Sequence, residues 1–397
     1  MNILFLTLVE INSVHERGIY QDLLRKFVEE GHNVTIVTPV ERRKKIITNL
    51  NIIGNVKIVQ VKTLNIQKTN IIEKGIGTLA IEYQYLSVVK KYLSDLKFDL
   101  LLYSTPPITF YKVINFIKNR DNAFTYLLLK DIFPQNAVDM KLIKAGSILH
   151  KIFVKKEKKL YQISDAIGCM SQANVDFILK YNEELKGEKV HINPNTIQPH
   201  FIDYSHEEKN AIKSKYNLPL DKKILIYGGN LGKPQGLEFL LETIEKINLE
   251  EVFYLIVGNG TEYNKIEKWF LAHKPINAKL IQSIPKTEYD LLLGACDIGL
   301  IFLNKNFTIP NFPSRLLSYL EMKMPVIAAT DNNSDIGKVI QDAKCGISVE
   351  TGNLIDMKEG ILKCLPNGDM MGANSKKLLQ NEYIVDVSYH LIINKIK

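Results

Sequence analysis

The stretch KILIYGGNLGKPQGLEFLLETIEK, residues 223–246, decides the fold class. Its first five residues are mostly apolar and predict a buried strand, while residues 237–246 repeat apolar side chains at helical spacing and predict a helix. A glycine-rich loop, Gly228–Gly236, joins the two. A strand that passes through such a loop into a helix opens a βαβ unit, so this stretch indicates a parallel sheet.

The same alternation of short apolar runs and helical patterns extends to both ends of the chain. We therefore expect an α/β protein with two doubly wound, Rossmann-like domains: residues 1–200 and residues 201–375, joined near residues 197–220. Residues 376–397 should be helical and pack back on the first domain. The predicted strands are Ile3–Leu8, Val34–Val37 (closed by Pro39), Val56–Val61, Leu100–Tyr103, Phe124–Leu129, Lys223–Tyr227, Val252–Val257, Ile298–Phe302 and Pro325–Ala328.

Composition excludes several classes of protein. The chain has 397 residues, 46% of them apolar and 24% charged, which is typical of a soluble globular protein and not of a disordered or fibrous one. The four cysteines have no metal-ligand spacing, so neither a zinc site nor a disulfide framework is expected, and a reducing cytoplasm fits. The apolar N-terminus ends at Glu10 without a preceding basic region, which predicts a buried strand, and no window is long enough for a membrane span.

The net charge of +8 is unevenly distributed, because residues 1–200 carry nine more basic than acidic side chains. Residues 147–162 (SILHKIFVKKEKKLYQ) form a basic amphipathic pattern. Such a helix can lie on an anionic membrane surface or can be a core-facing helix with solvated lysines, and the charge of this half favours the membrane. Its lysines are Lys151, Lys155, Lys156, Lys158 and Lys159.

Two loops of the second half carry possible phosphate chemistry. In Gly228–Gly236, glycines let the backbone approach a phosphate and Lys233 adds positive charge, although a plain glycine-rich turn is an equally good interpretation. In Asn311–Glu321, Pro313 and Ser314 mark a helix start beside Arg315, which could grip a diphosphate with two hydrogen bonds. A capped helix with a solvated arginine is the alternative there.

Other motifs carry less information. Gly258-Asn259-Gly260 lacks the third glycine of a dinucleotide fingerprint and favours a tight turn. Lys130-Asp131 follows a predicted strand and suits either a polar site or a surface ion pair. D-x-D, H-E-x-x-H and G-x-S-x-G motifs are missing, so a required metal is not indicated. We also expect no cofactor and no nucleic-acid partner.

Taken in order, these segments resemble glycosyltransferase family 4, the retaining nucleotide-sugar enzymes of the GT-B fold. The resemblance covers nearly the whole chain. Within this family the chain is similar to bacterial surface-polysaccharide enzymes, especially L-fucosamine transferases. It implies two facing Rossmann-like domains with the site in the cleft between them. The segments that carry it are Ser164–Ile167 with Ser171, Ile192–Thr196, GGNLGKPQGLEFLL, YLIVGNGTEY, ACDIGLIFL and NFPSRLLSYLEMKMPVIAAT.

The resemblance implies roles for individual residues. Lys233, Arg315 and Asp131 would be catalytic, the first two by neutralising the departing diphosphate. His15, Glu16, Arg17 and Gly18, with Lys130, would form a loop region at the acceptor or the donor phosphates. The nucleotide sugar would be bound by Gly229, Asn230, Gly232, Gly258, Ser283, Ile284, Pro313, Ser314, Leu316, Ser318 and Glu321.

The same resemblance implies a substrate and a location. The donor would be a UDP-sugar, with an N-acetylated amino sugar, and the acceptor a polyprenyl-diphosphate-linked saccharide of capsule or O-antigen synthesis. The enzyme would lie in the cytoplasm, peripherally associated with the inner face of the bacterial plasma membrane.

The sequence departs from the family at five slots, one of which is Lys130, where the family often has a histidine before the aspartate. The two usual glutamates fall on Pro310 and Ser318, so Glu321 or Ser318 would have to contact the ribose. The usual arginine and lysine of the glycine-rich loop fall on Asn230 and Gln235, which leaves Lys233 to supply the charge. A nucleotide-sugar 2-epimerase and an inactive GT-B scaffold therefore stay open as alternatives.

Overall fold

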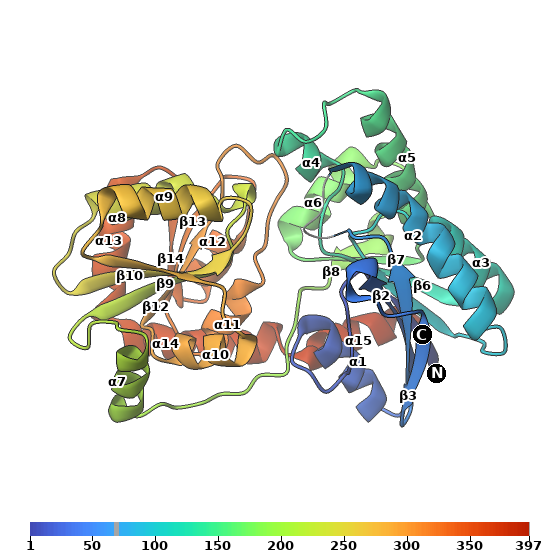
Figure 1. Cartoon of the computed structure of the whole chain (residues 1–397), viewed down its shortest axis with the longest axis horizontal. Coiled ribbons are helices and arrows are strands. Elements are labelled where there is room, and N and C mark those ends of the chain that lie inside the picture. The colour runs from blue at the N-terminus through green and yellow to red at the C-terminus, as the bar shows by residue number, and fades with distance from the viewer. Residues whose placement is uncertain (67–70, 397) are drawn as a thin grey trace. The chain divides into compact units, whose positions relative to one another are not determined.

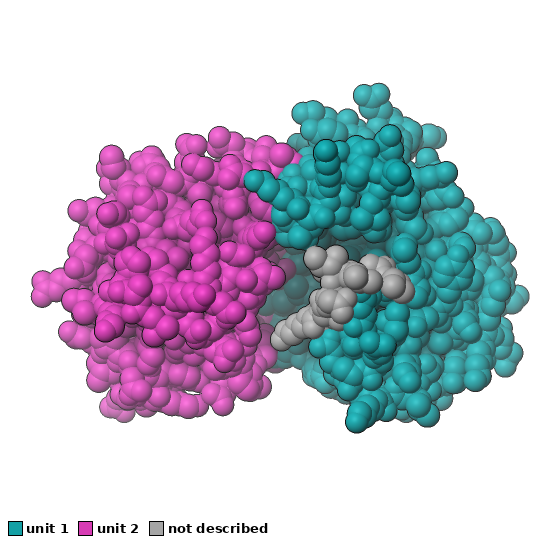
Figure 2. Space-filling view, turned by 45° about the horizontal axis from the view of Figure 1, so that its top comes forward, with its two compact units in different colours: residues 1–198, 385–397 teal, residues 199–384 magenta. Residues whose placement is uncertain are grey.

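The structure, a computed structural model, describes residues 1–66 and 71–396 and divides the chain into two compact units. Unit 1 comprises residues 1–198 and 385–397, and unit 2 comprises residues 199–384; Figure 2 colours them teal and magenta. The sequence predicts that the second domain ends at residue 375. In the structure this end comes later, because the helix Gly368–Glu382 packs within unit 2, where the Ser375 hydroxyl donates a hydrogen bond of 2.7 Å to the Met324 carbonyl.

Unit 1 is built on an eight-stranded sheet. Its strands, in chain order, are β1 (Asn2–Leu6), β2 (Asn33–Glu41), β3 (Asn49–Ile53), β4 (Val56–Thr63), β5 (Leu100–Ser104), β6 (Phe124–Leu129), β7 (Ala166–Cys169) and β8 (Val190–Ile192). Its helices are α1 (Ile19–Glu29), η1 (Arg42–Lys44), α2 (Ile71–Tyr92), α3 (Tyr111–Asp121), α4 (Gln135–Asp139), α5 (Ile148–Ile163), α6 (Gln172–Tyr181), η2 (Gly187–Lys189) and α15 (Val385–Ile396).

The strand order of this sheet is β3-β4-β2-β1-β5-β6-β7-β8, and only the β3–β4 pair is antiparallel. The order reverses between β1 and β5, so the loops after these two strands flank the topological switch point. The core beneath α1 and α15 contains Phe5, Phe27 and Ile36, each without exposed surface. Doubly wound sheets bind ligands at the carboxyl edge of such a switch point, which makes this edge a candidate site.

The chain returns to unit 1 through α15, which packs on α1 (Figure 1). Tyr389 meets Phe27 with ring centroids 5.0 Å apart, and the Lys26 ammonium lies 2.7 Å from the Asp386 carboxylate. The Ser388 hydroxyl donates a 2.7 Å hydrogen bond to the side chain of buried Asn193. The predicted helical segment 376–397 is thus two helices, one in each unit.

Unit 2 contains a six-stranded, wholly parallel sheet. Its strands are β9 (Lys223–Asn230), β10 (Val252–Asn259), β11 (Ala278–Gln282), β12 (Ile298–Phe302), β13 (Val326–Thr330) and β14 (Gly346–Glu350). Its helices are α7 (His206–Lys215), η3 (Lys233–Gln235), α8 (Leu237–Lys246), α9 (Tyr263–His273), α10 (Lys286–Gly294), α11 (Arg315–Glu321), α12 (Ile336–Asp342), α13 (Leu354–Cys364) and α14 (Gly368–Glu382).

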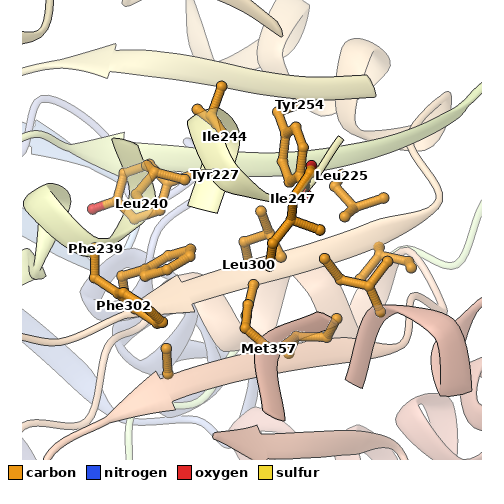
Figure 3. Close-up of a cluster of buried hydrophobic side chains, with 14 of the residues drawn as sticks. Leu225, Tyr227, Phe239, Leu240, Ile244, Ile247, Tyr254, Leu300, Phe302 and Met357 are labelled. Carbon is orange, nitrogen blue, oxygen red and sulfur yellow. Dashed lines mark hydrogen bonds between the residues drawn. The ribbon is translucent and has the colours of Figure 1, made fainter. Parts of the chain in front are cut away.

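The strand order β11-β10-β9-β12-β13-β14 is that of a Rossmann fold and reverses between β9 and β12. Figure 1 shows α8 and α9 on one side of this sheet and α10 and α14 on the other. One face packs Tyr227, Leu240, Phe302 and Met357 into a continuous core, shown in Figure 3. The predicted α/β class with two Rossmann-like domains is confirmed.

Some strands differ from the sequence prediction. Strand β2 does not close at Pro39 but continues to Glu41. Strand β1 ends at Leu6, opposite Val37, so Pro39 pairs only with β4, and a residue without an N–H is tolerated where a strand has one neighbour. Strands β3, β7, β8, β11 and β14 were not predicted.

Among the residues that the structure describes, no helix has the length and apolarity to cross a membrane. Within the same residues, no group of three or more histidine, cysteine, aspartate or glutamate side chains could hold a metal ion.

Candidate functional site

The candidate site of unit 2 lies at the carboxyl edge of its sheet, beside the switch point between β9 and β12. The loop after β9 contains η3, and the loop after β12 leads into α11. The two loops are tied together, since the Asn304 N–H donates to the Pro234 carbonyl over 2.9 Å and the Asn304 side chain donates to the Lys233 carbonyl over 3.2 Å. Residues 71 positions apart in sequence are thereby held at one place.

The glycines of this edge are required by close packing. Gly229 and Gly236 have φ angles of +119° and +58°, a region that favours glycine. A Cβ on Gly258 would stand 1.9 Å from the Gly229 carbonyl oxygen, and one on Gly232 would stand 3.0 Å from the side chain of Asn230. The glycines predicted to approach a nucleotide sugar thus also allow the ends of β9 and β10 to meet.

Arg315 is the most specific feature of this edge. One of its terminal nitrogens, Nη2, donates a 2.5 Å hydrogen bond to the Gln235 side-chain oxygen, and its guanidinium carbon lies 4.2 Å from the centre of the Tyr227 ring. The other terminal nitrogen, Nη1, is buried without a hydrogen-bond partner. A buried, charged donor that lacks a partner is costly, so this nitrogen is suited to an anionic ligand.

The charge of Arg315 is secure at every physiological pH. Burial alone would lower the pKa of its guanidinium, but interactions with Tyr227 and Tyr319 outweigh burial and raise it. Lys233, in the adjacent turn, is exposed, and Asn230 beside it is exposed as well. This edge therefore combines one fixed, oriented cation with one solvated cation.

The other predicted site residues in and before α11 differ in burial and in their hydrogen bonds. Pro313 and Leu316 are buried and Ser318 is half-buried. Ser314 occupies the N-cap position, but its side chain makes no capping hydrogen bond, so the predicted cap is wrong; its backbone is already helical. Glu321 is only 2% exposed, and its carboxylate accepts a 2.6 Å hydrogen bond from the His200 N–H.

The geometry of Glu321 favours a structural role over ribose binding. His200 lies two residues after the chain enters unit 2, so this carboxylate anchors the incoming segment. Ser283 and Ile284 follow β11 at the same carboxyl edge, with Ser283 exposed and Ile284 half-buried.

The predicted loop of unit 1 follows β1 at its switch point. His15, Glu16 and Arg17 are exposed and Gly18 is half-buried. The loop is held from within by Arg25 of α1, whose guanidinium donates to the Val14 carbonyl over 2.6 Å and pairs with buried Asp22 over 2.6 Å. A Cβ on Gly18 would stand 2.3 Å from the Gln21 side chain.

Lys130 and Asp131 follow β6 at the same edge of unit 1. Both backbone N–H groups donate to the Thr105 hydroxyl, over 3.0 and 3.2 Å, which joins the ends of β5 and β6. Burial lowers the pKa of the Lys130 ammonium to about 7. Burial raises the pKa of the Asp131 carboxyl to about 6, against hydrogen bonds from Asn136. The two do not form a surface ion pair; each is a separate group that titrates near neutrality.

The structure thus forms two clusters, one per unit. Lys233, Asn230, Arg315 and the predicted glycines gather in unit 2, and Lys130 and Asp131 share an edge with the loop after β1 in unit 1. Sequence reasoning assigned Gln235 only as the replacement of a lysine, and it missed Tyr227. The only sequence signal for a role of Gln235 was its place as a polar residue directly before Gly236, whose positive φ angle favours glycine.

Comparison with known proteins shows which families and folds this chain is similar to. The family "Glycosyl transferases group 1" matches residues 208–378. The probable glycosyltransferase WbjE of Pseudomonas aeruginosa is 20% identical over 319 residues, covering 80% of this chain and 78% of that protein. The putative colanic acid biosynthesis glycosyl transferase WcaI of Escherichia coli is 25% identical over 199 residues, covering 47% and 48%.

Among solved structures, HepE from Anabaena in complex with UDP has the same fold, with a TM-score of 0.70 and 12% identity over 100% of this chain and 99% of that one. The fold and these matches together define a transferase of the glycosyltransferase class, with a GT-B architecture. More particularly, residues 208–378 of this chain are similar to the glycosyl transferases group 1 family.

Proposed function

We propose that this enzyme transfers a sugar from a UDP-sugar to a lipid-linked saccharide in the synthesis of a bacterial surface polysaccharide, with retention of anomeric configuration. Unit 2 would bind the donor and unit 1 the acceptor. An N-acetylated amino sugar as the transferred group, and a polyprenyl-diphosphate-linked saccharide of capsule or O-antigen synthesis as the acceptor, are parts of the same proposal.

The observation that carries the proposal is the guanidinium of Arg315. It is oriented by Gln235 and by the Tyr227 ring, and its buried Nη1 has no partner. It stands at the carboxyl edge of β9, where doubly wound sheets bind nucleotides. A diphosphate would supply the missing acceptor, and Lys233 lies in the adjoining turn.

Relatives support both substrates. HepE, whose fold this chain shares, was solved in complex with UDP, which supports a uridine nucleotide. The name of WcaI refers to colanic acid biosynthesis, which supports a polysaccharide product. These are properties of the relatives and motivate the choice of substrates to test.

The chemistry can be assigned to residues of the chain. The bond between the anomeric carbon and the diphosphate oxygen breaks, and a bond forms to the acceptor hydroxyl oxygen. The hydroxyl proton passes to the departing phosphate. Arg315 and Lys233 would stabilise the negative charge that develops on the diphosphate, in place of a divalent cation. Asp131 would accept a hydrogen bond from the acceptor.

The test is a screen of radiolabelled UDP-sugars against purified full-length enzyme with and without polyprenyl-diphosphate saccharides. We expect one UDP-sugar to give a lipid-extractable product, with turnover that persists in EDTA. If every UDP-sugar is left unchanged while another nucleotide sugar is used, the donor assignment is overturned. If UDP-N-acetylamino sugars are only epimerised at C2, the enzyme is an epimerase and the transfer proposal fails.

A further inference from the structure

Helix α5 and the segment before it carry a charge pattern that the proposed chemistry does not use. Between Asp139 and Glu157 there is no acidic residue, and the lysines in that interval are Lys141, Lys144, Lys151, Lys155 and Lys156. Two further lysines, Lys158 and Lys159, follow directly. The structure decides which of these charges face solvent.

Four side chains of α5 are engaged in contacts with other side chains. The Lys156 ammonium lies 3.8 Å from the buried Glu82 carboxylate, and the Tyr161 hydroxyl donates a 2.8 Å hydrogen bond to Glu157. Lys158 pairs with Glu184 over 3.1 Å. Lys156 is therefore not part of the outward basic face that the sequence predicted for it.

The outward lysines border a hollow in the surface. Lys151, Lys155 and Lys159 are exposed, and none of the described acidic side chains lines the hollow with them. The hollow has a volume of about 620 Å³, large enough for a phosphate-bearing head group and open to solvent. Its lining consists of Gly146, His150, Lys151, Val154, Lys155, Lys158, Lys159 and Gln162.

Large apolar side chains stand exposed at the start of the same helix. Ile148 is 80% exposed and Leu142, in the preceding segment, is 60% exposed. Leu149 and Ile152 are exposed as well, and positions 148, 149 and 152 lie on one face of a helix. An apolar tip beside a row of lysines is the pattern of a helix that lies in a membrane interface. We call this set, with the hollow, the α5 surface.

The topology places the α5 surface near the candidate acceptor groups. Helix α5 crosses from the end of β6 back to β7, so it starts at the carboxyl edge of the sheet of unit 1. Lys130 and Asp131 lie at that edge, as does the loop after β1. The exposed isoleucines Ile148 and Ile152 are in the first two turns of α5, at its end nearest to that edge.

We propose that the α5 surface docks on an anionic lipid bilayer, with Ile148, Leu149 and Ile152 entering the interface and the hollow receiving lipid phosphate groups. This proposal names the partner that presents the acceptor and in that respect rests on the proposed function. Charge complementarity selects lipid phosphate as the occupant, because lysines line the hollow and no described acidic side chain is part of that lining.

The test is co-sedimentation of the full-length protein with vesicles of phosphatidylcholine alone and with 30% phosphatidylglycerol added. We expect binding to the anionic vesicles only, because each lysine at an anionic surface contributes about fivefold in partition. The triple variant K151Q/K155Q/K159Q should bind about 100-fold more weakly. The double variant I148S/I152S should lose about tenfold per isoleucine.

Unit 2 offers matched controls. K268Q/K274Q/K358Q removes three exposed lysines, and I276S/I355S removes two isoleucines that are 90% and 73% exposed. Both should bind anionic vesicles as the natural chain does. If the natural chain binds neither vesicle, or if the α5 variants match the controls, the proposal is overturned. Calorimetric UDP binding without vesicles should be unchanged in all variants, so a failed membrane surface is distinguishable from a failed donor site.

Discussion

The charged groups at the carboxyl edges of the two sheets differ in whether their charge can change near neutral pH. In unit 2, Arg315 is a permanent cation, oriented by Gln235 and Tyr227 and left with a free buried donor. In unit 1, burial brings the pKa of Lys130 to about 7 and that of Asp131 to about 6, so both groups can change charge near neutral pH. Two sheets with the same switch-point topology thus offer a fixed electrostatic site and a titratable one.

This difference matches the two halves of a transfer reaction. A leaving diphosphate is anionic throughout and gains from a charge that never moves. In the proposed reaction the acceptor hydroxyl gives its proton to the departing phosphate, so the titratable groups of unit 1 would position this hydroxyl by hydrogen bonds and would not remove its proton. The following predictions test each side of the comparison.

Removal of the fixed cation should have the largest effect. Arg315→Ala should lower turnover by about 10²–10³-fold, as loss of one preorganised donor at developing charge does elsewhere. Steady-state kinetics with the UDP-sugar found in the screen would measure this. Lys358→Ala, at an exposed site of unit 2, is the control. Equal turnover in the two variants would remove Arg315 from the reaction.

Neutralisation of the titratable carboxyl should change stability in a pH-dependent way. The folded-state pKa of Asp131 lies above its unfolded value, so ionisation of this carboxyl destabilises the fold increasingly as pH rises toward about 6 and in full above that pH. Asp131→Asn should therefore raise the free energy of unfolding by about 1–3 kcal/mol at pH 8, and by less at pH 5.

Urea unfolding at the two pH values would measure this difference, and turnover should fall in the same variant. An equal stability gain at pH 5 and pH 8 would show that Asp131 does not titrate as described.

The support of the arginine can be tested without removing its charge. Gln235→Leu deprives Arg315 Nη2 of its acceptor, which should weaken UDP binding by about tenfold, in line with the about 1–3 kcal/mol cost of an unsatisfied buried donor. Gln235→Glu keeps an acceptor but cancels the positive charge, so it should weaken UDP binding further. Calorimetry ranks the three forms, and the reverse order would contradict the assigned geometry.

The smallest effect on UDP binding is expected where α15 packs within unit 1. Ser388→Ala removes a buried hydrogen bond between α15 and Asn193 and should cost about 1–2 kcal/mol of unfolding free energy. UDP affinity should stay within twofold of the natural value, because α15 belongs to unit 1. A large loss of UDP affinity would mean that the two regions are not separable as described.

The strands that could be predicted from sequence are those buried on both faces. Residues 124–129 and 223–227 are mostly apolar runs, and both became central strands. Strand β3 is an edge strand whose residues NLNII are half-buried or exposed, so it leaves no apolar run to detect. The helical tail could not be divided in advance, since only tertiary packing shows that residues up to 384 belong to unit 2.

The individual residues of the candidate site could be predicted from the sequence, but the contacts between them could not. Lys233, Arg315 and the glycines were found from loop chemistry next to predicted strands. The bond from Arg315 to Gln235 spans 80 residues and arises only when β9 and β12 become neighbours. Glu321 lies three residues after Ser318, a spacing that suits a ligand contact. In the structure its carboxylate is instead bound by the backbone of His200, in the segment that enters unit 2. No sequence pattern indicates this contact.

The central claim is that unit 2 binds a nucleoside diphosphate at Arg315. Amide hydrogen exchange with and without saturating UDP tests it most directly. We predict slower exchange in residues 228–237 and 303–316 and no change in α15, with the protection lost in Arg315→Ala. Protection confined to unit 1, or no protection at all in the natural chain, would contradict the account.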